Sequence, residues 1–144
     1  MIIYNPKREI EYRYKLAVQY LNDAENAYSR RDWRSCVASA QMAVENAAKT
    51  LIAIHRVPSW SHDPSRELIE LIDKFPKEFE EKIQELANYA HILAPEHART
   101  SYGDPTLGLT PWELYDEEYA RKCLEIARKA VEIMKRVIEV VLKK

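Results

Sequence analysis

Glycine is nearly absent from this chain: only Gly103 and Gly108 occur among 144 residues. Both fall in residues 99–115, a segment without the helical periodicity of the sequence around it. Long irregular segments inside compact helical domains are uncommon and are usually functional or disordered. This segment is too rich in aromatic and charged side chains for a disordered linker, since it holds Arg99, Tyr102, Asp104, Trp112 and Tyr115. We therefore predict that the loop and the helix end before it form the functional site.

The sequence also lacks a long apolar run and an excess of charge of either sign. Its uncharged stretches are shorter than the roughly 18 apolar residues of a membrane span, and its net charge is −1. This balance excludes the strongly basic surface expected for broad binding to duplex nucleic acid, but not a local basic pocket. Residues 1–6 have neither the basic start nor the apolar core of a signal peptide. We expect a soluble, cytoplasmic protein that does not associate with membranes.

Cysteine is scarce as well, with Cys36 and Cys123 far apart in the sequence. The chain has no Cys-x-x-Cys pair, no clustered Cys and His, and no Glu-x-x-His pair on a predicted helix. It also has no glycine-rich phosphate loop. We expect two reduced, buried cysteines, and we expect neither a metal nor a cofactor.

Apolar residues recur with alternating spacings of four and three in four segments, which predicts amphipathic helices packed side by side. These segments cover residues 10–28, 33–54, 79–93 and 120–141. Asp32 is placed to cap the second helix, and residues 110–113 read as a capping box with proline at the first helical position. The length suits one domain. We predict a single all-α domain over residues 1–144: an antiparallel, up-and-down bundle of four main helices plus one short helix at about 64–75.

The second predicted helix carries both small and polar residues. Its many alanines let neighbouring helices approach closely, so we expect it to be central. Gln41, Glu45 and Lys49 follow one another at four-residue spacing. This stripe is either a solvated face with a Glu45–Lys49 pair or a polar wall that faces a cavity or a second subunit.

Several of these features together resemble a known family. The run 43–49 on the second helix precedes His62, and a short helix with Leu68 and Leu71 follows. The later segment Arg99…Tyr102-Gly103-Asp104 leads through an aromatic turn into a long last helix. In this order, from about residue 16 to 137, the chain resembles the HEPN (higher eukaryotes and prokaryotes nucleotide-binding) domain family.

The resemblance implies a small helical bundle that forms homodimers. Many members of the family act with a separate minimal nucleotidyltransferase in toxin–antitoxin systems, and catalytically active members are metal-independent RNases. Apolar positions outside the main stripes also favour a homodimer: Tyr12, Leu16 and Tyr20 in the first helix, and Cys123 and Ala130 in the last.

The RNase motif of the family, an arginine followed four to six residues later by a histidine, is incomplete here. Gly103, Asp104 and Pro105 stand where Arg99 would require the histidine. The literal match Arg56 to His62 lies in the turn after the second helix, and we interpret it as coincidence. His97 precedes Arg99, so the order is reversed, and two residues so close on a helix share a site only where the helix unwinds.

We therefore predict a module that binds a nucleotide or an RNA phosphate through Arg99, whose planar guanidinium suits phosphate. The further residues of this predicted site are Tyr102, Asp104, Lys49, Glu45 and His62. A metal-independent RNase toxin, with Arg99 as the cation and His97 as the base, is one alternative. The other is a helical interaction module without a small-molecule site. Structural interpretations of single residues also stay open: Arg99 and Asp104 pair to fix the loop with Tyr102 packed beneath them, and His62 is a turn residue bonded to backbone.

Overall fold

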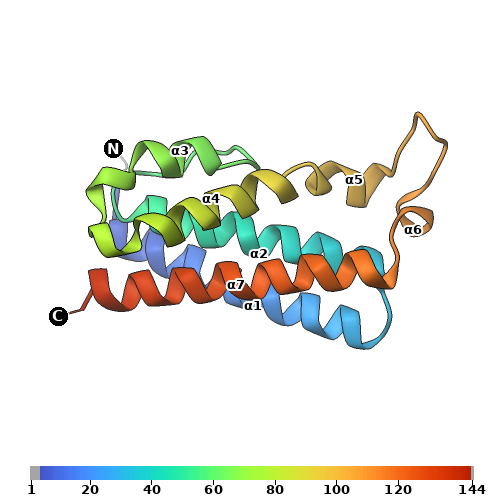
Figure 1. Cartoon of the computed structure of the whole chain (residues 1–144), viewed down its shortest axis with the longest axis horizontal. Helices are drawn as coiled ribbons and strands as arrows, with labels where there is room; N and C mark the ends of the chain where they lie inside the picture. The colour runs from blue at the N-terminus through green and yellow to red at the C-terminus, as the bar shows by residue number, and fades with distance from the viewer. Residues whose placement is uncertain (1–3, 144) are drawn as a thin grey trace.

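The main helices lie antiparallel, as Figure 1 shows for the computed structural model, which describes residues 4–143. Residues 1–3 and 144 lie outside the described part, and with them the first half of segment 1–6 and both ends of the predicted domain. The long helices are α1 (Pro6–Ser29), α2 (Trp33–Ala53), α4 (Glu80–Leu93) and α7 (Glu117–Val141). They run alternately up and down, so the predicted bundle of four main helices is confirmed.

Shorter helical pieces join and extend the bundle. They are α3 (Ser65–Glu70), η1 (Ile72–Lys74), η2 (Lys77–Phe79), α5 (Glu96–Tyr102) and α6 (Pro111–Leu114). The short helix predicted at 64–75 is thus α3 followed by the 3-10 turn η1. Residues 4–143 contain no β-strand, and none of their helices is both long and apolar enough to cross a membrane.

Side chains cap the helices where the sequence places short polar residues. The Asp32 carboxylate accepts a hydrogen bond from the Ser35 N–H at 3.2 Å, and Asp116 accepts one from the Tyr119 N–H at 2.9 Å. At α6, the Glu113 carboxylate accepts from the Thr110 N–H at 3.0 Å, which confirms the predicted capping box. These bonds satisfy amide groups that a helix start leaves without an intrahelical partner.

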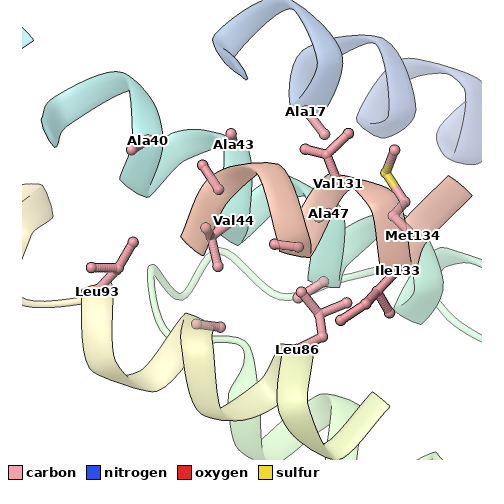
Figure 2. Close-up of a cluster of buried hydrophobic side chains, with 14 of the residues drawn as sticks. Ala17, Ala40, Ala43, Val44, Ala47, Leu86, Leu93, Val131, Ile133 and Met134 are labelled. Atoms are coloured by element: carbon pink, nitrogen blue, oxygen red, sulfur yellow. The ribbon is translucent and has the colours of Figure 1, made fainter. Parts of the chain in front are cut away.

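The core forms around α2, which packs against α1, α4 and α7. Figure 2 shows the small side chains of α2 between larger apolar groups of the other helices. The small members are Ala40, Ala43 and Ala47, and the surrounding groups include Leu86 of α4 and Val131 and Met134 of α7. The central position of α2 follows from these alanines, because helices approach closely where side chains are short. Both cysteines are free and buried in this core, as predicted.

The segment predicted as one irregular stretch, residues 99–115, contains helix at both ends. Arg99 and Tyr102 belong to α5, and residues 111–114 form α6. Between them the chain makes a tight reversal closed by an isolated antiparallel bridge between Asp104 and Leu109. This turn projects beyond the end of the bundle (Figure 1). The expectation of an irregular segment from residue 99 was wrong, because α5 continues through Tyr102; the helix start predicted at residues 110–113 is present as α6.

Gly103 is what allows α5 to end so abruptly. Its φ is +71°, a conformation that side chains other than glycine rarely adopt. A Cβ at this position would also collide with the Leu109 carbonyl oxygen. The turn that carries Asp104 therefore depends on glycine at position 103.

Candidate functional site

The buried carboxylate of Glu96 organises the end of the bundle where α5 meets α7. Tyr115 donates a hydrogen bond to Oε1 at 2.6 Å, and Tyr119 donates one to Oε2 at 2.7 Å. Arg99 adds a charged donor, with Nη1 at 2.8 Å from Oε2. A buried carboxylate is tolerated only where such donors replace water. Burial and the bonds to Glu96 raise the pKa of both tyrosines, so their hydroxyls stay protonated.

Arg99 is the charged donor of this network that is partly exposed to solvent. Its side chain is 40% exposed, whereas that of Glu96 is 3% exposed. Burial by itself would lower the pKa of Arg99, but the charges of Glu96, Tyr115 and Tyr119 raise it. The guanidinium is therefore a permanent cation that is anchored at one nitrogen and belongs to a partly exposed side chain.

The surroundings of Arg99 differ from the alternative in which Arg99 pairs with Asp104 over a packed Tyr102. The Asp104 carboxylate instead accepts a hydrogen bond from the Leu107 N–H at 3.2 Å, inside the turn. Tyr102 is 76% exposed, so it does not pack beneath an ion pair. It lies three residues after Arg99 on α5 and hence on the same helix face. Arg99 and Tyr102 therefore share a face of α5, whereas Asp104 belongs to the turn.

An exposed aromatic group lies at the same end of the bundle, on α6. Trp112 is 72% exposed, and the Arg34 guanidinium of α2 lies over its ring, 5.3 Å from the centroid. Arg34 also donates to the Thr100 carbonyl at 3.0 Å and so ties α2 to α5. Sequence reasoning missed Arg34, Glu96 and Tyr119. For Glu96 a signal existed, since it stands three residues before Arg99.

A second polar cluster lies on α2, where the predicted stripe of Gln41, Glu45 and Lys49 is found. These three side chains are 2%, 4% and 3% exposed, so the solvated-face interpretation was wrong. The predicted Glu45–Lys49 pair is present at 3.1 Å, and Gln41 Nε2 donates to Glu45 Oε1 at 3.0 Å. The polar wall of the other interpretation is present, but it faces His62 and His97 of this chain.

Two histidines cover this wall from other elements. His62, in the connection before α3, places Nδ1 3.2 Å from Glu45 Oε1, and His97 of α5 places Nδ1 3.1 Å from Gln41 Oε1. Their rings stack with centroids 3.5 Å apart. Burial and the nearby charges of His62 and Lys49 lower the pKa of His97, although Glu45 opposes them. The contact of His62 with a carboxylate replaces the predicted bond to backbone.

The two clusters lie on different faces of α5. His97 and Arg99 are two residues apart on an intact helix, which turns their side chains about 200° away from each other. The unwinding that would let them share a site does not occur. Glu45 and Lys49 are buried on α2, and no hydrogen bond or ion pair joins either of them to Arg99 among the described residues. Arg56 pairs with Glu67 at 3.1 Å and Glu70 at 3.2 Å, in line with its match to His62 being coincidental.

Comparison with known protein families matches the HEPN domain over residues 10–137. The match covers most of the chain, and the protein therefore belongs to the HEPN domain family. Neither the comparison with curated proteins nor that with solved structures gave a match.

Proposed function

We propose that this HEPN-family protein binds a nucleotide or an RNA phosphate through Arg99. The observation that carries the proposal is the ion pair between the partly exposed Arg99 and the buried Glu96 carboxylate. Two tyrosine hydroxyls donate hydrogen bonds to the same carboxylate and hold it in place. Such support fixes a guanidinium in space before a ligand arrives and reduces the entropy lost on binding. Family membership supports the same class of ligand.

The chemistry of the Arg99 side chain suits a phosphate group. Its contact with Glu96 uses Nη1, whereas Nη2 and Nε have no hydrogen-bond partner among residues 4–143. These two nitrogens offer parallel N–H donors of the kind that bind phosphate oxygens in pairs. Tyr102 would supply a ring face for a base next to that phosphate.

The alternative of a metal-independent RNase has weaker support. Cleavage needs a base close to the cation that stabilises the phosphorane. His97 contacts Gln41 and His62 on the other face of α5, and no histidine contacts Arg99 among the described residues. We therefore propose binding rather than cleavage. The remaining alternative is an interaction module. In that case Arg99 only stabilises the fold through its ion pair with Glu96 and binds no ligand.

We further propose that the protein forms a homodimer and acts with a nucleotidyltransferase of a toxin–antitoxin system, as its family membership suggests. Part of the sequence argument for a dimer has lapsed, because Cys123 and Ala130 are buried within the chain itself. Tyr12 is 53% exposed on α1 and still supports it. Light scattering at micromolar concentration tests the dimer, and a monomer mass would contradict it.

Binding and cleavage are tested together with a fluorescently labelled single-stranded RNA and with ATP as a mononucleotide. We expect Arg99→Ala to weaken binding roughly 10- to 150-fold, the effect of one charge-assisted contact worth about 1.5–3 kcal/mol. Arg136→Ala, at an exposed position of α7, is the control and leaves affinity unchanged. Equal binding by wild type and Arg99→Ala would refute the proposal. Metal-free RNA cleavage that requires both Arg99 and His97 would establish the RNase alternative.

A further inference from the structure

Glu45, His62 and His97 meet in one place although they lie far apart in the sequence. Each offers one ligand atom, a carboxylate oxygen or an imidazole nitrogen, and these atoms lie within 4.8 Å of one another. They come from α2, the connection before α3, and α5. Spacing along the chain does not predict this group, because no two of its members form a local motif.

Gln41 orients the ligand group. Its Nε2 donates to Glu45 Oε1, so its Oε1 is the atom that faces His97 Nδ1. A carbonyl oxygen can only accept, so Nδ1 of His97 carries a proton, and in the neutral ring the lone pair is on Nε2. Metal-binding histidines are held in this way by an acceptor on the ring nitrogen that does not bind the metal.

We propose that Glu45, His62 and His97 bind a divalent transition-metal ion, with Zn²⁺ as the best-suited ion. Two imidazoles and one carboxylate are ligands that Zn²⁺ commonly takes, and they leave further positions for water or another ligand. Two stacked rings cannot direct both lone pairs at one ion, so binding turns the His62 ring out of the stack. Its side chain is 52% exposed, which gives the ring room to move.

The charges that face the ion set its affinity. Glu45 supplies the negative charge, and the Lys49 ammonium, 3.1 Å from Glu45 Oε2, opposes the cation. Binding therefore uses Oε1, the oxygen that already faces His62. A bound ion would fasten the connection before α3 to both α2 and α5.

The test is thermal unfolding of the full chain with and without ZnCl₂, together with absorption spectra after addition of Co²⁺. We expect Zn²⁺ at 100-fold above its dissociation constant to raise Tm by roughly 5–10 °C, and EDTA to reverse the rise. Co²⁺ should give visible bands typical of histidine ligation at a low-coordinate site.

His62→Asn and His97→Asn should each abolish the Tm rise and the Co²⁺ bands. His91→Asn is the matched control, since His91 is an exposed histidine that is not one of the three ligands; its partner Asp63, at 2.8 Å, follows His62 in the sequence. His62 is half-exposed, so its variant keeps the fold, which circular dichroism verifies. Absence of a Zn²⁺ effect in the wild type, or an effect that survives in folded His62→Asn, would overturn the proposal.

Discussion

Glu96 and Arg99 form an ion pair of 2.8 Å one helical turn apart, in which the carboxylate is buried and the guanidinium is partly exposed. The Arg99 guanidinium compensates the negative charge of the buried Glu96 carboxylate. The same ion pair holds the Arg99 guanidinium in a fixed position. Arg99 therefore has two roles that can be measured separately: its charge stabilises the fold by compensating Glu96, and its remaining N–H groups are available to a ligand.

Glu96→Gln should lower the free energy of unfolding by about 3 kcal/mol, because it breaks a buried, charge-assisted network. Urea unfolding followed by circular dichroism measures the change. Glu118→Gln is the control, since Glu118 is exposed and lies 3.8 Å from Lys122. That variant should change stability by less than about 1 kcal/mol. Equal, small effects of the two variants would show that the network contributes little.

Gly103→Ala should destabilise the protein more than Gly108→Ala. Both glycines have positive φ, which costs a side-chain-bearing residue about 1–2 kcal/mol. Only at Gly103 does a Cβ also meet the Leu109 carbonyl, whereas Gly108 faces open space. The difference in free energy of unfolding between the two variants measures the collision. Identical losses would mean that the turn relaxes without cost.

Asp32→Ala tests the cap of α2 and its pH dependence. Burial raises the pKa of Asp32. Hydrogen bonds from Ser35 and the charges of Arg34 and Arg30 together lower it by more, so the net shift of the pKa is downward. A lowered pKa means that the cap contributes above the unfolded-state pKa of about 3.9 and is lost as pH falls below it. At pH 7 the free energy of unfolding of the wild type should be about 1 kcal/mol larger than that of Asp32→Ala.

Urea unfolding at pH 7 and at pH 3 should show this difference shrinking in acid. If the difference in free energy of unfolding between wild type and Asp32→Ala stays constant with pH, the charge of Asp32 does not account for its contribution to stability.

Lys49→Met should tighten Zn²⁺ binding at least tenfold, because it removes a positive charge next to the proposed ligand Glu45. The methionine keeps the length of the buried side chain. Titration with Zn²⁺ against a competing chelator measures the affinity. Unchanged or weaker binding would contradict the placement of the ion beside Glu45.

The sequence was sufficient to predict the four long helices and the caps at Asp32 and Thr110, because periodicity and capping are local properties. The family resemblance also pointed correctly to the HEPN domain. Burial of the stripe along Gln41, Glu45 and Lys49 was not predictable. It depends on His62 and His97, which come from distant parts of the chain.

The alternative in which Arg99 pairs with Asp104 was wrong for a related reason. Asp104 stands nearby in a segment expected to be loop, and it was a plausible partner there. Once α5 continues through Arg99, helical geometry places Glu96 beside it instead. Whether Arg99 contacts Glu96 or Asp104 therefore depends on where α5 ends.

The affinity and stability of Arg99→Lys, measured on the same sample, test the central proposal most directly. Lysine keeps a positive charge for Glu96 but loses the planar fork that suits phosphate. We predict a Tm close to that of the wild type and at least a tenfold loss of affinity for single-stranded RNA or ATP, while the control Arg136→Lys changes neither. Wild-type affinity in Arg99→Lys, or a loss of affinity no larger than in the control, would contradict phosphate recognition by Arg99.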